Sequence, residues 1–204
     1  LIYLDTGSMY RAVTWLLQRD FIDPENNAMI DQMLKNLKLE FKTSNKGKQK
    51  IFINDIDITE QIRSPEVTSL VSKIASIESV REALTSQQQS IGAKGGIVAE
   101  GRDIGTVVFP DAEVKVFLTA SPKERARRRY LDLQNRGYKS PPIEDLEKEI
   151  KERDLQDSQR EIAPLIKAED AIELITDGMN IEAVITEITR IFRSKIPEEI
   201  WPSP

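Results

Sequence analysis

Cysteine and histidine are both absent from the 204 residues of this chain. Their absence excludes disulfides, thiol nucleophiles, Ser-His-Asp triads and the usual zinc sites, because each of these needs at least one of the two side chains. Any chemistry must therefore use Asp, Glu, Arg, Lys, Ser, Thr or Tyr.

An excess of positive charge and a long apolar run are also missing. The formal net charge is −5 at pH 7, whereas a nucleic-acid-binding domain usually carries an excess of Lys and Arg. No stretch approaches the roughly 20 apolar residues of a membrane span, and residues 1–4 lack the basic start of a signal peptide. We therefore expect a soluble, cytoplasmic protein with no nucleic-acid or membrane partner.

Strand-like and helix-like patterns alternate along the chain and predict an α/β fold with a mainly parallel sheet. Short apolar runs predict strands over 1–4, 97–99, 114–118 and 171–175. Helical spacing of apolar residues, or a high content of charged helix formers, predicts helices over 9–19, 27–38, 65–91 as two helices, 124–160 with a break at 136–142, and 181–193. The tail over 196–204 contains three prolines and is expected to be an extended docking segment.

Between residues 37 and 58 the period of the apolar residues changes to two. Leu37, Leu39 and Phe41 alternate with charged residues, and isoleucines recur at every second position over 51–53 and 56–58. This pattern predicts a small antiparallel sheet of about three strands, inserted into the main body, with a solvated loop over 43–50.

The first candidate site follows the first predicted strand. Residues 5–11 place capping side chains, a hydroxyl on Thr6 and the guanidinium of Arg11 at a helix N-terminus, where exposed N–H groups attract anions. These residues could hold a phosphate. Simple capping by Asp5 and Thr6, with Arg11 in solvent, explains the same pattern.

The second candidate site, residues 100–106, follows another predicted strand. Gly101 and Gly105 let the backbone approach a ligand closely, and the adjacent Arg102 and Asp103 offer a donor fork beside an acceptor. An Arg-Asp surface pair in a turn is the alternative. The position at a strand end favours a functional role.

Two further groups of arginines lie in the charged segment. Arg153, Asp157 and Arg160 are spaced four and then three residues apart, so one helical face carries a carboxylate between two guanidinium groups. A structural ion-pair ladder explains this spacing equally well. Arginines also cluster at 125 and 127–129, where they face solvent or bring positive charge to a phosphoryl-transfer site.

Together these motifs resemble cytidylate kinases of the bacterial type, members of the P-loop nucleoside monophosphate kinase family. The matching stretches are 4–11, 80–84, 100–112 and 151–165, of which the run Gly-Arg-Asp-Ile-Gly-Thr-Val-Val-Phe-Pro-Asp-Ala at 101–112 is highly specific. The resemblance implies a three-layer sandwich with a parallel core sheet. It also implies core segments at 1–31, 81–125 and 159–204, an NMP-binding insertion at 32–80 and a short lid at 126–158.

The resemblance further implies a set of site residues for phosphoryl transfer from ATP to CMP or dCMP. The phosphate of CMP would be held by Thr6, Arg11, Arg102 and Arg160; the sugar by Arg153 and Asp157; and the cytosine by Ser72, Arg81 and Asp103. Arg102, Arg128 and Arg160 are the candidate catalytic residues. ATP is implied as co-substrate with Mg²⁺, with no metal held by the protein itself, and the family is usually monomeric.

One feature of the family is missing. Its Gly-x-x-Gly-x-Gly-Lys-[Ser/Thr] loop, which cradles the phosphates of ATP, occurs nowhere in this sequence, so the ATP-binding residues stay unknown. We interpret the chain as truncated before this loop and inactive alone. In some bacteria this kinase is fused behind a pantoate–β-alanine ligase, which would also explain a start without Met.

Two other functions stay open at this point. A kinase for another monophosphate, such as UMP or AMP, would share most of these residues. A non-catalytic nucleotide-binding module would share the binding residues but not the activity.

Overall fold

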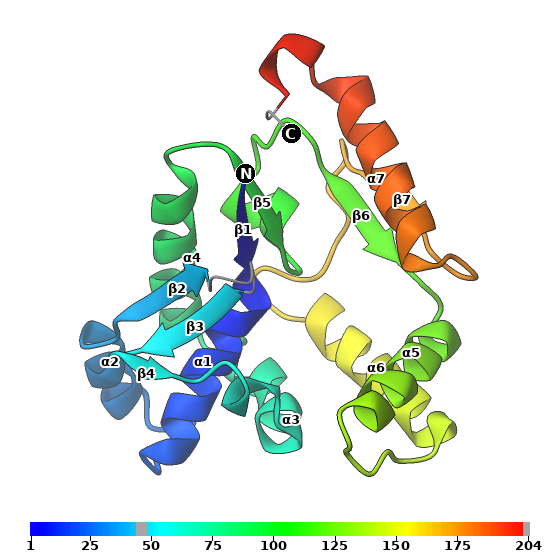
Figure 1. Cartoon of the computed structure of the whole chain (residues 1–204). Helices are drawn as coiled ribbons and strands as arrows, with labels where there is room; N and C mark the ends of the chain where they lie inside the picture. The colour runs from blue at the N-terminus through cyan, green and yellow to red at the C-terminus, as the bar shows by residue number, and fades with distance from the viewer. Residues whose placement is uncertain (44–48, 202–204) are drawn as a thin grey trace. The chain divides into compact units, whose positions relative to one another are not determined.

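The computed structural model describes residues 1–43 and 49–201, and the chain divides into two compact units, Leu1–Gly101 and Arg102–Pro204. Figure 1 shows the elements of both units, which are described separately below. Within the described ranges, no helix combines the length and the apolar character needed to cross a membrane.

Unit 1 combines a pair of parallel strands with a small antiparallel sheet and helices. Its elements are β1 (Ile2–Asp5), α1 (Thr6–Arg19), α2 (Asn27–Lys35), β2 (Leu39–Thr43), β3 (Gln49–Ile53), β4 (Ile56–Asp57), the 3₁₀ turn η1 (Gln61–Arg63), α3 (Pro65–Ile74), α4 (Glu78–Gly92) and β5 (Ile97–Glu100). β1 pairs in parallel with β5, so that Leu4 lies opposite Ala99. β2, β3 and β4 form the predicted antiparallel sheet. Residues 44–48 of the predicted loop lie outside the described residues.

Helix α1 begins three residues earlier than predicted, at Thr6. The cause is Asp5, whose Oδ1 accepts a hydrogen bond from the backbone N–H of Ser8 at 2.9 Å and so caps the helix. The first turn of α1 therefore starts directly at the carboxyl end of β1.

The core of unit 1 joins α1 to the antiparallel sheet. Ala12 and Leu16 of α1 pack with Ile51 and Ile53 of β3, and all four side chains are buried. Five partly buried apolar side chains pack against this cluster: Trp15, Met33, Leu37, Leu39 and Phe41. The alternating apolar residues thus form one face of the sheet, and α1 packs on that face. This packing holds α1 and its N-terminus in place.

Gln88 is an exception within the buried face of α4. It is completely buried, and both polar atoms of its side-chain amide lack a hydrogen-bond partner among the described residues. A buried amide without partners costs about 1 to 3 kcal/mol.

We predict that Gln88→Met, which keeps the shape but removes the polar atoms, raises the free energy of unfolding by about 1 kcal/mol in urea denaturation. Gln32→Met, at an exposed position of α2, serves as the control and should change stability by less than about 0.5 kcal/mol. A loss of stability in Gln88→Met would show that the amide is satisfied in solution.

Unit 2 combines a second parallel strand pair with a helical hairpin and a C-terminal helix. Its elements are the π-helical turn η2 (Ile104–Val108), β6 (Val116–Thr119), α5 (Pro122–Asn135), α6 (Ile143–Ser158), β7 (Ile172–Ile175), α7 (Ile181–Lys195) and the 3₁₀ turn η3 (Glu198–Ile200). β6 pairs in parallel with β7, so that Val116 lies opposite Ile172. The tail is not extended at 198–200, where η3 forms, and its last residues, 202–204, lie outside the described residues.

Helices α5 and α6 form an antiparallel hairpin, visible in Figure 1. Its small core consists of Ala126, Leu133 and Leu146. Gly137 lies in the connection with a φ of +77°, a conformation that suits glycine, and the predicted break at 136–142 is confirmed. The hairpin thus has a core of its own and few large buried side chains.

Candidate functional site

Thr6 lies where β1 ends and α1 begins. It is 2% exposed, and its Oγ1 donates a hydrogen bond to the backbone carbonyl of Glu100 at the end of β5, at 2.6 Å. The predicted phosphate-binding hydroxyl therefore joins the carboxyl ends of the two parallel strands. To donate to a phosphate, it would have to give up this bond, because a hydroxyl has one proton.

Arg11, one and a half turns further along α1, connects this helix to α3. Its Nη1 donates to Oγ1 of Thr68 at 2.9 Å and to the backbone carbonyl of Ile62 at 3.1 Å. Thr68 and the predicted base contact Ser72 are four residues apart on α3 and so share one face of the helix. Sequence reasoning missed Thr68, although its spacing from Ser72 was a usable signal.

Arg81 is a buried cation on α4. It is 4% exposed; its Nη1 donates to the backbone carbonyl of Ala75 at 2.9 Å, and its guanidinium carbon lies 5.3 Å from the centre of the Tyr10 ring. A ring face at this distance attracts a cation and fixes its plane. Tyr10, which sequence reasoning left without a role, thus links Arg81 to the helix that carries Thr6 and Arg11.

In unit 2, Asp103 begins the π-helical turn η2. Its backbone carbonyl accepts hydrogen bonds from the N–H groups of Thr106, Val107 and Val108 at 3.3, 2.9 and 3.2 Å. The Asp103 residue is 4% exposed. π-helical turns are rare and often occur at functional sites. A Cβ at Gly105 would lie 3.2 Å from Cδ of Lys115, so a larger residue there would require the Lys115 side chain to shift slightly.

Asp157 is the centre of a cluster of arginines. Its carboxylate lies 3.1 Å from Nε of Arg102, 3.9 Å from Nε of Arg153 and 3.6 Å from Nη1 of Arg160, and its side chain is 4% exposed. Three of the predicted site residues are therefore brought together around a fourth. We call these four residues the Asp157 cluster.

A second ion pair extends the Asp157 cluster and was not predicted. Arg125 of α5 donates two hydrogen bonds to Asp154 of α6, at 2.5 and 2.9 Å. Burial lowers the pKa of Arg153; the charges of Arg102 and Arg125 lower it further, while Asp157 and Asp154 oppose this shift. Positive charge is thus concentrated here beyond what the two carboxylates balance.

A strained turn follows Arg160 and returns the chain to Asp157. α6 ends at Ser158, so Arg160 lies beyond the helix on which it was predicted. Ala163 adopts a φ of +49°, which is unfavourable for a residue with a Cβ, and its carbonyl accepts a hydrogen bond from Nη2 of Arg160 at 2.6 Å. The N–H of Leu165 donates to the carbonyl of Asp157 at 2.8 Å. Strain of this kind gathers at functional sites.

Arg128, the remaining predicted catalytic residue, contacts other groups. Its guanidinium donates to a carboxylate oxygen of Glu124 at 2.8 Å, to Oγ1 of Thr176 at 3.0 Å and to the backbone carbonyl of Thr176 at 2.6 Å. It therefore ties α5 to the end of β7.

The described residues contain no cluster of metal ligands comparable to the arginines around Asp157. Within residues 1–43 and 49–201, no group of three or more acidic side chains is placed to hold a metal ion. The described residues thus offer guanidinium groups and hydroxyls, which suit an anionic ligand. Parallel strands that end in such groups are typical of α/β proteins that bind phosphorylated small molecules.

Comparison with known proteins identifies a particular family within this class. Residues 1–194 match the family described as Cytidylate kinase. The chain is 68% identical over 203 residues to the bifunctional pantoate ligase/cytidylate kinase of Prochlorococcus marinus (strain NATL2A), with 100% of this chain and 39% of that protein covered. The chain belongs to the cytidylate kinase family.

Other relatives carry the same description. The bifunctional pantoate ligase/cytidylate kinase of Prochlorococcus marinus (strain MIT 9303) is 61% identical over 204 residues, with 100% of this chain and 42% of that protein covered. That of Synechococcus sp. (strain CC9605) is 55% identical over 204 residues, again with 100% and 42% covered. The chain therefore spans about two fifths of the length of these relatives. Their names agree with the fusion that the resemblance suggested.

Proposed function

We propose that this chain binds CMP or dCMP and takes part in the transfer of the γ-phosphoryl group of ATP to it. In this proposal Thr6, Arg11 and Arg81 of unit 1 act on the same nucleotide as Arg102, Asp103 and the rest of the Asp157 cluster. Membership of the cytidylate kinase family supports the reaction. Within each unit, the contacts described above support the choice of residues.

The observation that carries the proposal is the concentration of cationic side chains around Asp157. Arg102, Arg153 and Arg160 surround one carboxylate within 3.9 Å, in a chain whose net charge is −5. A nucleotide phosphate near this cluster would relieve the repulsion among its guanidinium groups. Arginine suits the task because its planar fork donates two parallel hydrogen bonds to phosphate.

Base selection is assigned to two buried side chains. Cytosine presents an amino donor at N4 where uracil presents an acceptor, so the Asp103 carboxylate would accept from cytosine and repel uracil. Arg81, held over the Tyr10 ring, can donate to the O2 and N3 acceptors of cytosine. Ser72 shares its helix face with Thr68 and completes the proposed base-binding set.

Catalysis by such a site needs no histidine. A monophosphate is largely dianionic near neutral pH, because its second pKa is about 6, so it can attack without a general base. Positioning and neutralisation of charge then supply the rate enhancement. Arg128 would contribute by giving up its hydrogen bonds to Thr176 and donating to phosphoryl oxygens instead.

The proposal for ATP and Mg²⁺ rests on the family rather than on residues of the site. Mg²⁺ usually binds through substrate phosphates and retained waters, so we expect phosphate oxygens to be its chief ligands. Mg²⁺ would neutralise charge on the phosphates. We assign no residue of this chain to either group.

The proposal extends to the arrangement of the fold and to partners. The two parallel strand pairs would belong to one three-layer sandwich, with 32–80 as the NMP-binding insertion and 126–158, which contains the α5–α6 hairpin, as the lid. The ligands would be small nucleotides of the cytoplasm. A pantoate ligase would be the fused partner, because the relatives bear that name.

Steady-state rates of the whole encoded protein with ATP and CMP, dCMP, UMP or AMP test the proposed function. We expect CMP and dCMP to be preferred over UMP by about tenfold to a hundredfold in kcat/KM. Equal use of UMP and CMP would contradict the role of Asp103. Binding of CMP without any turnover would instead show a nucleotide-binding module.

A further inference from the structure

The two hydrogen bonds that tie Arg11 to the segment 62–68 leave from the same nitrogen. Nη1 of Arg11 donates to Oγ1 of Thr68 at 2.9 Å and to the backbone carbonyl of Ile62 at 3.1 Å. Because Nη1 carries two hydrogens, these two acceptors use both of them. Both acceptors are neutral, so they orient the guanidinium without cancelling its charge. A phosphate that accepts two parallel bonds from Arg11 would therefore meet the edge formed by Nε and Nη2.

The direction of the Thr68 hydroxyl is fixed by a second bond. Its Oγ1 donates to the backbone carbonyl of Ser64 at 2.8 Å. Ser64 is itself held as the N-cap of α3, where its side chain accepts a hydrogen bond from the N–H of Val67 at 3.2 Å. A hydroxyl has one proton, so the bond to Ser64 leaves the lone pairs of Oγ1 to accept from Arg11. The first turn of α3 thus presents to Arg11 an acceptor in a set direction.

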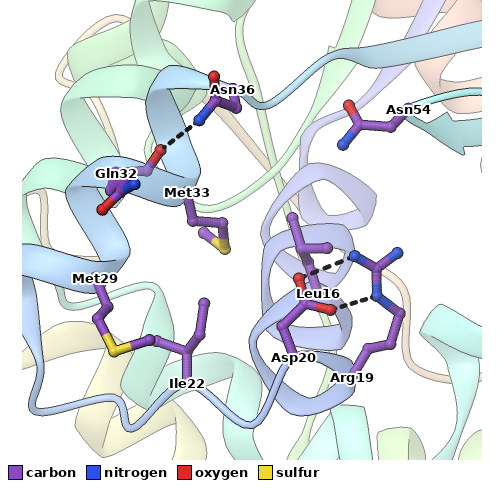
Figure 2. A pocket seen from close by; sticks show the side chains of 9 residues that line it. All are labelled: Leu16, Arg19, Asp20, Ile22, Met29, Gln32, Met33, Asn36 and Asn54. Carbon is purple, nitrogen blue, oxygen red and sulfur yellow. Dashed lines mark hydrogen bonds and ion pairs between the residues drawn. The ribbon is translucent and has the colours of Figure 1, made fainter.

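The second arginine of α1 is bound differently. Near the end of α1, Nε and Nη2 of Arg19 donate to the two carboxylate oxygens of Asp20 at 2.6 and 2.9 Å, beside the pocket that Figure 2 shows. The edge of Arg19 that could donate two bonds to a phosphate is thus occupied by a carboxylate, which also balances its charge. At Arg11, by contrast, Thr68 and Ile62 take the other terminal nitrogen, Nη1.

We infer that Thr68 is a positioning residue, which turns Arg11 so that its Nε–Nη2 edge faces the phosphate of the bound nucleotide. The inference rests on the proposed function, in which Arg11 binds that phosphate. Thr68 acts through Arg11 and not on the nucleotide. The proposed base contact Ser72 lies about one turn further along α3, so one helix would both orient the arginine at the phosphate and contribute to the base site.

Three single substitutions isolate the hydroxyl of Thr68. Thr68→Val removes it and keeps the branched shape of the side chain. The carbonyl of Ser64 still accepts the N–H of residue 68 at 3.0 Å, so this carbonyl keeps a hydrogen bond in the variant. Thr68→Ser keeps a hydroxyl at the same place. Ser69→Ala is the matched control, because it removes an exposed hydroxyl of the same helix that donates to the carbonyl of Glu66 at 2.9 Å.

Calorimetric titration of the whole encoded protein with CMP, in the absence of ATP, measures the effect. We expect Thr68→Val to weaken CMP binding about tenfold, because a hydrogen bond to a charged group is lost. Thr68→Ser and Ser69→Ala should stay within about twofold of the wild-type affinity. Cytidine, which lacks the phosphate, is the second probe. Its affinity, measured by ligand-observed NMR, should be unchanged in Thr68→Val, whereas a disturbed base site would weaken cytidine and CMP alike.

Arg11→Ala separates failure of this inference from failure of the proposed function. It should weaken CMP binding at least as much as Thr68→Val does. The double variant Arg11→Ala/Thr68→Val should bind CMP no more weakly than Arg11→Ala alone, because Thr68 acts through Arg11. Full CMP affinity in Arg11→Ala would overturn both the inference and the phosphate contact that the proposed function gives to Arg11.

If Arg11→Ala does weaken CMP binding, four results overturn the inference alone. The first is normal CMP affinity in Thr68→Val, and the second is an equal loss for CMP and cytidine in that variant. The third is a loss in Thr68→Ser or Ser69→Ala as large as the loss in Thr68→Val. The fourth is additive losses in the double variant, which would show that the hydroxyl acts independently of Arg11.

Discussion

Asp157→Asn is expected to lower the free energy of unfolding by about 3 kcal/mol, because it removes the negative charge at the centre of the Asp157 cluster. Arg160, whose side chain is 7% exposed, would lose the negative charge of Asp157 in a poorly hydrated place. The loss should stay near the lower end for a buried pair, because Arg102 and Arg153 are 39% and 34% exposed in their side chains and can be hydrated. Urea unfolding followed by circular dichroism measures it.

Asp132→Asn is the matched control for this prediction. Asp132 also contacts two arginines, Arg129 at 3.4 Å and Arg136 at 2.8 Å, but its side chain is 42% exposed. Removing an exposed carboxylate of this kind should cost less than about 1 kcal/mol. Similar losses in both variants would show that burial gives the Asp157 cluster no special energetic role.

Asp103→Ala is expected to relax base choice, while Arg102→Ala lowers the rate with every base. Removing the Asp103 carboxylate takes away an acceptor for N4 of cytosine and a source of repulsion for uracil. The preference for CMP over UMP in kcat/KM should therefore fall by about tenfold to a hundredfold. Removing Arg102 takes away positive charge near the proposed phosphate, so kcat/KM should fall for all monophosphates by a similar factor, about a hundredfold.

The control for this pair is Asp111→Ala, an exposed carboxylate later in the same stretch, 100–112. It should leave both the rate and the preference unchanged. Parallel losses with CMP and UMP in Asp103→Ala and Arg102→Ala would contradict the separate roles of these two neighbours.

Much of the fold was predictable because local signals agree with it. The change of period near residue 37 predicted the antiparallel sheet, and the predicted break at 136–142 separates α5 from α6. Element ends were less predictable. β6 begins at Val116 rather than 114, and α2 ends at Lys35 rather than 38, because pairing with β7 and capping at Asn36 decide these ends.

The site was predictable where residues of one segment act together. The spacing of Arg153, Asp157 and Arg160 anticipated their ion pairs, although Arg160 lies just beyond the last residue of α6 and also donates to the carbonyl of Ala163. Contacts between segments left no such signal. The pairing of Arg102 with Asp157, 55 residues apart, and the bond of Arg128 to Thr176 depend on tertiary packing that no local pattern encodes.

The central proposal is that Arg11, Arg102 and Arg160 bind the phosphate of one nucleotide. NMR signals of the arginine side chains, assigned through Arg→Lys variants, test it directly when CMP is added. The account predicts that Arg11 of unit 1 and Arg102 and Arg160 of unit 2 shift together and saturate at the same CMP concentration. Signals that move in only one unit, or that saturate at different concentrations, would contradict it.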